Sequence, residues 1–325
     1  MPTGQGKGRP GEVELTNLDQ PLFEGADATK RDLVDYLEAV EEQLLAELRE
    51  RPLSVMRALR GRRPFMQKNL PRYAPPWMRT VTIWADSSKR EVTYALCNDR
   101  ATLLWFANQR AVEYHPMLVR VDRPDRAQTH LVLDVDPPPG APFDAVVRTA
   151  RLVREALAEA GLAGAVKTSG AKGVHVFVPI AQPATAEEIA AATRALAARA
   201  ERLDRELATT AYVLADREGK VFIDGTRTGG ASVVAAYSPR IRPGATVSCP
   251  VAWDELDRVA PSDFTIHTVP ALIGTGDPWA DRLCEPQPLP PALVEEGRAI
   301  PVARVAAMHE GKRRARSRRR EADGE

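Results

Sequence analysis

The chain has 325 residues, with 45 Lys and Arg side chains against 44 Asp and Glu. This length exceeds the usual single domain, yet it allows one elaborated α/β enzyme core. The three cysteines, Cys97, Cys249 and Cys284, are too few for a disulfide framework and too widely spaced for a Cys-x-x-Cys metal pair. No stretch has the apolar length of a membrane span or of a signal-peptide core, so we expect a cytoplasmic protein with no membrane partner.

Charge is distributed unevenly along the chain. The last fifteen residues carry seven basic and three acidic side chains, which leaves 38 basic against 41 acidic side chains in residues 1–310. Net charge therefore does not predict nucleic-acid binding for the folded part, and only a local cluster could provide it. Residues 1–12 and the tail from Gly311 onward are expected to be disordered. The tail fits either nonspecific phosphate contacts or a solubilising terminus.

The expected secondary structure alternates loosely between helices and strands. Residues 29–50 have apolar side chains at helical spacing, and residues 80–84 and 92–96 have the pattern of strands. Asp99 is placed to cap a short helix over residues 99–109. A strand is expected at 131–136, a helix at 143–160, a strand from His175, an alanine-rich helix at 184–203, and strands at 221–224 and 232–236 joined by a turn. The pattern predicts an α+β (mixed α/β) fold: a mainly antiparallel or mixed catalytic sheet flanked by helices, with an N-terminal module of helices and strands.

Two carboxylates end the strand at 131–136. Because side chains alternate along a strand, Asp134 and Asp136 leave one face while Leu133 and Val135 enter the core. Acids this close repel each other unless a cation lies between them, and Mg²⁺ and Mn²⁺ prefer carboxylate oxygens. Asp224 ends another apolar strand. The strand thus indicates half of a metal site, although an isolated Asp-x-Asp-Pro is more often a solvated strand exit.

A glycine-containing loop precedes the strand of His175. Its two glycines would let backbone N–H groups converge on an anion, Ser169 adds a hydroxyl and Lys172 adds a positive charge. This is phosphate-binding chemistry without the spacing of a P-loop. A β-turn with a surface lysine and a buried histidine explains the loop equally well.

Residues 51–85 contain no Asp or Glu. Basic side chains alternate there with aromatic ones, which suits the phosphates and unpaired bases of single-stranded or overhanging DNA. The alternative is a solvated basic loop over core aromatics. The cluster comprises Arg57, Arg60, Arg62, Arg63, Lys68, Arg72 and Arg79 with Phe65, Tyr73, Trp77 and Trp84.

Three segments, in their order and spacing, carry a family resemblance. Leu-Asp-Val-Asp-Pro-Pro at 133–138, Thr-Ser-Gly-Ala-Lys-Gly-Val-His-Val at 168–176 and Val-Phe-Ile-Asp at 221–224 resemble the polymerase domain of bacterial ligase D. That domain belongs to the archaeo-eukaryotic primase superfamily. The resemblance implies a single primase-polymerase catalytic domain over residues 13–292. Residues 293–325 are then a C-terminal extension, with no room for a ligase or nuclease domain.

The resemblance also implies roles for individual residues. Asp134, Asp136 and Asp224 would be catalytic and hold two divalent cations, Mn²⁺ or Mg²⁺. The incoming NTP or dNTP would be bound by His115, Ser169, Lys172, His175 and Arg240. Taken alone, His115 beside Pro116 would be a core histidine. DNA contacts would come from Asn17, Lys30, Arg57, Phe65 and Lys68.

The chain departs from the family pattern at three places. Gln20 stands where a lysine is expected in the pocket for the 5′-phosphate of the downstream strand, which leaves Asn17 and Lys30. Arg227 and Thr228 replace a Gln-Asn pair after the third acid. Met66 replaces one aromatic residue of a template-stacking pair, so it offers packing with less stacking.

The resulting expectation is a bacterial, nucleoid-associated enzyme that adds rNTPs or dNTPs to a primer 3′-hydroxyl at DNA gaps, overhangs or broken ends, directed by a template. An end-joining role would bring Ku and a separate DNA ligase as partners, whereas gap filling would need no Ku. Two alternatives stay open: a catalytically inactive scaffold that binds DNA ends, and a de novo primase. Retention of three mutually repelling acids argues against the inactive scaffold.

Overall fold

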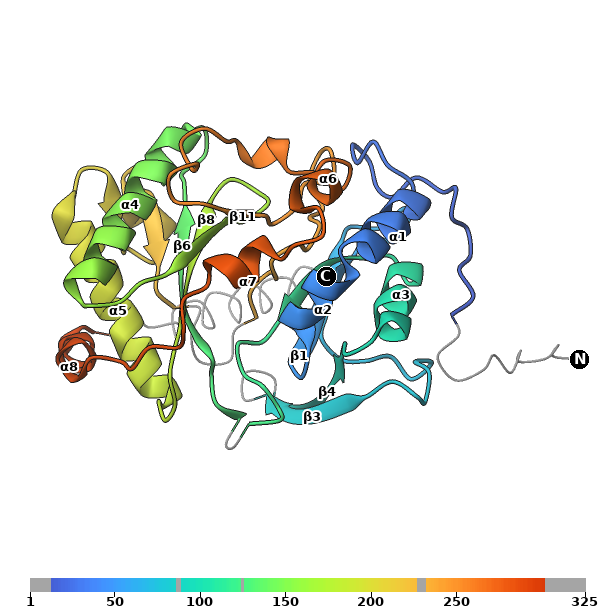
Figure 1. The fold of residues 1–325 in the computed structure, drawn as a ribbon, viewed down its shortest axis with the longest axis horizontal. Helices are drawn as coiled ribbons and strands as arrows, with labels where there is room; N and C mark the ends of the chain where they lie inside the picture. Colours follow the sequence, from blue (N-terminus) through green and yellow to red (C-terminus); the bar gives the residue numbers. More distant parts are fainter. Residues whose placement is uncertain (1–12, 86–88, 124–125, 227–231, 302–325) are drawn as a thin grey trace, which may run out of the picture.

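The computed structural model describes residues 13–85, 89–123, 126–226 and 232–301. Two sheets lie side by side, each with its own helices (Figure 1). Antiparallel pairing dominates both sheets, as the sequence predicts. Among the named strands of the described residues, only β9 and β10 pair in parallel. In the described ranges no helix is both long and apolar enough to cross a membrane.

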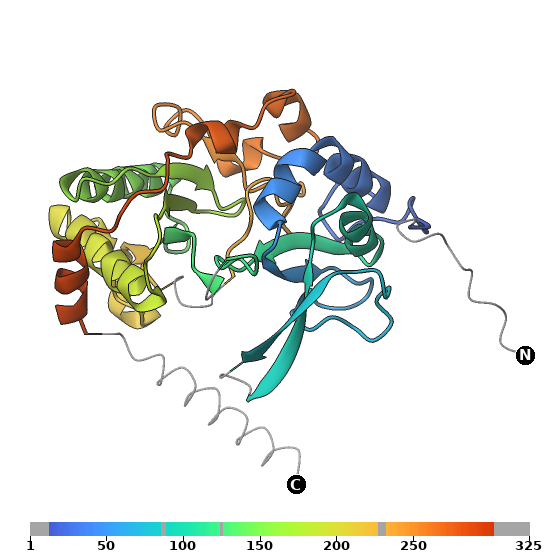
Figure 2. The ribbon, with the colours of Figure 1, turned by 60° about the horizontal axis from the view of Figure 1, so that its bottom comes forward.

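The N-terminal module is a five-stranded sheet packed against three helices. Its strands follow the order β2-β1-β4-β3, and β5 pairs with β1. The β3–β4 hairpin projects away from the helices (Figure 2). The elements are α1 (Lys30–Ala39), α2 (Glu41–Leu48), β1 (Pro52–Arg57), β2 (Phe65–Gln67), β3 (Thr80–Ala85), β4 (Arg90–Leu96), α3 (Arg100–Asn108) and β5 (Ala111–Pro116).

Side-chain caps start two of the three helices of this module, α1 and α3. Thr29 caps α1 in a capping box with Asp32, and Asp99 caps α3 as predicted by accepting the Thr102 N–H. The single helix predicted over 29–50 is wrong in one respect, because the chain breaks at Val40 into α1 and α2. The apolar spacing continues through the break, since both helices bury their leucines in the same core.

The second sheet has the strand order β11-β7-β8-β6-β10-β9. Helices α4 and α5 contact its central strands, and α8 packs along α5 (Figure 1). The elements are β6 (His130–Asp136), α4 (Phe143–Glu159), β7 (Ala165–Thr168), β8 (Val174–Pro179), α5 (Ala186–Leu203), β9 (Ala208–Thr209), β10 (Val221–Asp224), β11 (Pro250–Val251), α6 (Val269–Ile273), α7 (Pro278–Arg282) and α8 (Pro291–Ala299).

Residues 232–251 join the two sheets. The N–H groups of Val233 and Ala235 donate to β5, and the Cys249 carbonyl accepts from the last residue of β7. The strand predicted over 232–236 is therefore an extended segment with one isolated bridge, from Ser232 to Met117. Because residues 232–251 form hydrogen bonds with both sheets, they fix the position of the first sheet relative to the second.

Helix α8 crosses position 292, where the sequence analysis ends the catalytic domain. Glu296 pairs with Arg199 and Arg202 of α5, and Gly297 lies so close to α5 that an added Cβ would meet the Ala191 carbonyl oxygen at 1.8 Å. The packed part of the chain thus continues to the end of α8. The predicted disordered ends, 1–12 and 311–325, and Arg227 and Thr228 lie outside the described residues.

Candidate active site

Four polar residues form one line across the second sheet, which we call the cross-strand row. The register pairs Asp224 with Asp134, Asp134 with His175, and His175 with Lys167. Directly paired residues in antiparallel strands project from the same face, and Asp136 joins them because it lies two residues after Asp134. The register therefore brings the three predicted catalytic acids together at one end of β6 and β10.

The donor set has the chemistry that hard divalent ions require, since all three side chains offer carboxylate oxygens. The strands place the three acids near one another, but their side chains do not converge on one point. Among the described residues, no group of three His, Cys, Asp or Glu side chains is placed to hold an ion. Asp224 Oδ1 accepts the Thr226 N–H and hydroxyl at 2.8 and 2.6 Å. Closure around an ion would thus take side-chain rotations, while the strands already have the necessary register.

A pocket of about 220 Å³ opens beside Asp134 and Asp136. It collects most of the predicted nucleotide-binding residues from three separate parts of the chain: His115 from β5, Ser169 and His175 from β7–β8, and Arg240. Two predicted residues are not among those that line it. Asp224 lies further along the cross-strand row, and Lys172 is exposed next to Ala171.

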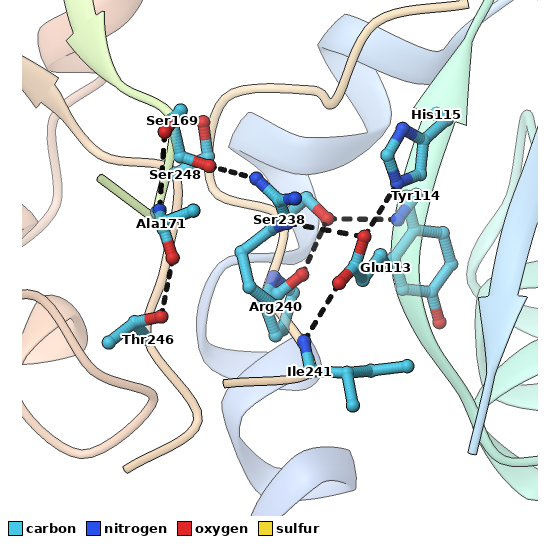
Figure 3. Close-up of polar contacts among 12 residues, drawn as sticks. Glu113, Tyr114, His115, Ser169, Ala171, Ser238, Arg240, Ile241, Thr246 and Ser248 are labelled. Atoms are coloured by element: carbon cyan, nitrogen blue, oxygen red, sulfur yellow. Dashed lines mark hydrogen bonds and ion pairs between the residues drawn. The ribbon is translucent and has the colours of Figure 1, made fainter. Parts of the chain in front are cut away.

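Glu113 holds two of the residues that line this pocket, His115 and Arg240, a role that sequence reasoning missed. Its Oε2 lies 2.8 Å from His115 Nε2 and 3.2 Å from Arg240 Nε, and its Oε1 accepts the Ile241 N–H (Figure 3). Burial alone would raise the pKa of Glu113, but the hydrogen bond with His115 and the Arg240 charge prevail and lower it to about 2. Burial lowers the pKa of His115, against the opposing effect of Glu113. The ionised carboxylate thus orients both groups.

The loop from 169 to 173 packs tightly against the catalytic strand. Arg240 Nη1 donates to the Ser169 carbonyl, and a Cβ on Gly173 would meet the Val135 carbonyl oxygen at 2.1 Å. The predicted anion nest is not open, because the N–H groups of Ala171 and Gly173 both donate to Ser169 Oγ at 3.2 Å (Figure 3 draws the first). With its oxygen accepting twice, the Ser169 hydroxyl has its proton to offer to a ligand.

Lys167 is the second residue that sequence reasoning left without a role. Its side chain is fully buried, with Nζ 3.0 Å from His175 Nδ1 and 2.6 Å from Ser248 Oγ. Burial and the charge of Arg240 lower the pKa of Lys167 to about 7. Burial and Lys167 in turn lower the pKa of His175 to about 4, so its imidazole is neutral at physiological pH. Lys167 and its partners therefore form a buried polar layer behind the pocket.

The predicted DNA-binding residues differ in exposure. Phe65, Tyr73 and Trp84 are 39, 61 and 55 % exposed, and Lys68 is exposed as well. Arg57 is instead buried, donating to Gln67 and Tyr73 side chains and to the Gln109 carbonyl. We conclude that Arg57 braces the β1–β2 hairpin, while the exposed aromatic rings are accessible for stacking with bases.

The two residues predicted to bind a 5′-phosphate also differ in exposure. Asn17 is exposed, whereas Lys30 is 2 % exposed and its Nζ donates to the Thr16 carbonyl and to Asn108 Oδ1. Burial, followed by the charge of Arg110, lowers the pKa of Lys30. In this conformation Lys30 ties the N-terminal segment to the end of α3 and does not face solvent.

Arginines surround a second cavity of about 730 Å³. Arg60, Arg62, Arg63 and Arg110 line it together with apolar residues that include Ile241, the neighbour of Arg240. Glu24 is the one acid among the residues that line it. This basic cavity therefore adjoins the wall of the candidate active site.

Comparison with protein families agrees with this geometry. The sequence model of the family described as the LigD primase-polymerase domain matches residues 29–279 of this chain. The chain belongs to this family. Two relatives are LigD proteins that are described as non-homologous end joining proteins. The protein from Mycobacterium tuberculosis is 32 % identical, and the match covers 83 % of this chain and 37 % of that protein. The protein from Bacillus subtilis is also 32 % identical, and the match covers 86 % of this chain and 45 % of that protein. The chain thus spans less than half the length of these relatives.

A solved structure of the polymerase domain of Mycobacterium tuberculosis ligase D in complex with DNA has the same fold. The TM-score is 0.76 at 32 % identity, and the match covers 84 % of this chain and 98 % of that one. The predicted α+β primase-polymerase fold is therefore confirmed.

Proposed function

We propose that this chain is a template-dependent nucleotidyltransferase that adds ribo- or deoxyribonucleotides to a primer 3′-hydroxyl at gaps or broken ends of DNA. One observation carries the proposal. Three carboxylates share one sheet face, and two of them, Asp134 and Asp136, line a pocket together with His115, Ser169 and Arg240. Negative groups for cations thus lie beside positive and hydrogen-bonding groups for phosphates, the arrangement that transfer of a nucleotidyl group requires.

The acidic residues would bind cations, and the basic and hydroxyl groups would bind the phosphates. Asp134, Asp136 and Asp224 would hold two divalent cations, Mn²⁺ or Mg²⁺, which when bound would activate the 3′-hydroxyl and neutralise charge on the triphosphate. Arg240, held by Glu113, presents a fixed positive charge to the phosphates. The Ser169 hydroxyl offers a hydrogen bond. Because these groups are already positioned by buried contacts, little reorganisation is needed when the nucleotide binds.

DNA would lie across the first sheet and the basic cavity. The exposed rings of Phe65, Tyr73 and Trp84 suit stacking with unpaired bases, and the arginines of the basic cavity suit the sugar-phosphate backbone. The similar domain of Mycobacterium tuberculosis ligase D was solved in complex with DNA, which supports DNA as the partner of this chain.

The relatives point to the cellular process. Both are described as non-homologous end joining proteins, so a role in bacterial end joining is the first choice, in the cytoplasm at the nucleoid. Ku and a DNA ligase are the partners that this role would need. Gap filling in excision repair is the second choice. Gln20 and the burial of Lys30 weaken the case for 5′-phosphate recognition in either role.

The test is extension of a labelled primer on short-gap DNA, with Mn²⁺ or Mg²⁺ and with rNTPs or dNTPs. We expect templated extension by the wild type and by Asp254→Ala, an exposed control acid, and none by Asp136→Ala. Absence of extension with DNA binding intact would contradict the proposal and favour the end-binding scaffold. Synthesis without a primer would favour the primase.

A further inference from the structure

The hydrogen bonds around Lys167 have a fixed direction. Ser248 Oγ donates its single proton to the Thr168 carbonyl at 2.8 Å. The hydroxyl therefore accepts from Lys167 Nζ, 2.6 Å away. An ammonium group has donors only, so the contact of 3.0 Å between Lys167 Nζ and His175 Nδ1 requires Nδ1 to be the acceptor.

This direction decides where the imidazole proton lies. With Nδ1 accepting, the proton of the neutral ring is on Nε2, which lies 3.3 Å from Asp134 Oδ1. The opposite tautomer would put the lone pair of Nε2 against a carboxylate oxygen in a buried site, where such repulsion is poorly screened. An uncharged Lys167 amine still has two protons, one for Ser248 Oγ and one for His175 Nδ1, so it favours the same tautomer.

We propose that Lys167 is a positioning residue that fixes His175 in its Nε2–H tautomer, and that His175 thereby orients the Asp134 carboxylate. Lys167 is fully buried and is separated from the strand of Asp134 by β8, so it acts through the histidine without touching substrate. The expected consequence for metal binding rests on the proposed function, whereas the tautomer does not.

The tautomer is measured by long-range ¹H–¹⁵N NMR of the full chain labelled with ¹⁵N-histidine, without divalent ions. His175 is assigned by the loss of its signals in His175→Gln, and the exposed His267 is the internal control. We expect a pyridine-type Nδ1 and a pyrrole-type Nε2 in the wild type. In Lys167→Met this pattern should be lost or averaged, while Lys220→Met, which removes a surface lysine paired with Glu218, should keep it. A protonated Nδ1 in the wild type would overturn the proposal even if Lys167→Met did not fold.

Binding of Mn²⁺ alone, followed by electron paramagnetic resonance, separates positioning from charge. If Lys167 positions Asp134 through His175, Lys167→Met should weaken Mn²⁺ binding about 10- to 100-fold, as loss of an outer-shell partner does. If Lys167 matters only as a positive charge, its removal should tighten Mn²⁺ binding, and this result would overturn the proposal. A protein with the expected tautomer but no polymerase activity would contradict only the proposed function.

Discussion

Glu113→Gln tests the electrostatics of the pocket wall. The folded protein holds the pKa of Glu113 at about 2, against the ordinary value of 4.5 for a glutamate side chain. The carboxylate therefore stabilises the fold above the unfolded-state pKa, and this contribution is lost as the pH falls toward 2. The difference between these two pKa values, at about 1.36 kcal/mol per pH unit, corresponds to about 3 kcal/mol at pH 7, and more than half of this stabilisation is lost by pH 3.

Urea unfolding from pH 7 to pH 3, followed by tryptophan fluorescence, measures this contribution. Wild type should exceed Glu113→Gln in the free energy of unfolding by about 3 kcal/mol at pH 7, with the gap narrowing below pH 4.5. Glu285→Gln, at an exposed loop position, should follow the wild type at every pH. Parallel curves for the wild type and Glu113→Gln would refute the reasoning that the His115 and Arg240 contacts hold this carboxylate ionised.

Three further predictions concern packing and the DNA surface. Gly297→Ala should lower stability by about 1–3 kcal/mol in thermal unfolding, because its Cβ would collide with the Ala191 carbonyl, whereas Gly276→Ala, with 3.8 Å of room, should not. Trp84→Ala should weaken binding of overhanging DNA roughly 5- to 150-fold in fluorescence anisotropy without loss of stability, since stacking contributes about 1–3 kcal/mol per base; unchanged affinity would exclude Trp84 from the DNA surface. Lys30→Met should lower stability by about 1–3 kcal/mol through the lost bonds to Thr16 and Asn108. It should leave any gain from a 5′-phosphate in gap filling unaltered, and a selective loss of that gain would restore the phosphate-binding prediction.

Local rules predicted much of the second sheet and its acids. The alternation of side chains placed Asp134 and Asp136 on one face, and apolar patterns located β6, β8, β10 and the helices α4 and α5 within a few residues. These elements are strongly patterned because one face of the sheet is covered by helices. The cross-strand row from Asp224 on β10 to Lys167 on β7 depends on the register of the strands, and sequence spacing does not specify that register.

Long-range contacts explain what the sequence did not reveal. The sequence analysis did not predict strand β1, which lies in the basic segment of residues 51–85. Its pairing with β5 joins residues more than fifty positions apart. The Glu113–His115 spacing is visible in a strand, but its meaning depends on Arg240, which arrives from residues 232–251. Lys167 was assigned no role because only its pairing with His175 reveals its position. The family resemblance implies that Lys30 binds a 5′-phosphate, and only the fold shows that its side chain is buried.

The most direct test of the account is the number of Mn²⁺ ions bound per chain in the presence of a non-hydrolysable nucleoside triphosphate, measured by electron paramagnetic resonance. If Asp134, Asp136 and Asp224 form one site with the pocket, the wild type and the exposed-acid control Asp254→Asn should bind two ions. Asp136→Asn should lose at least one. Equal binding by the wild type and Asp136→Asn would contradict the assignment of these carboxylates as the metal site.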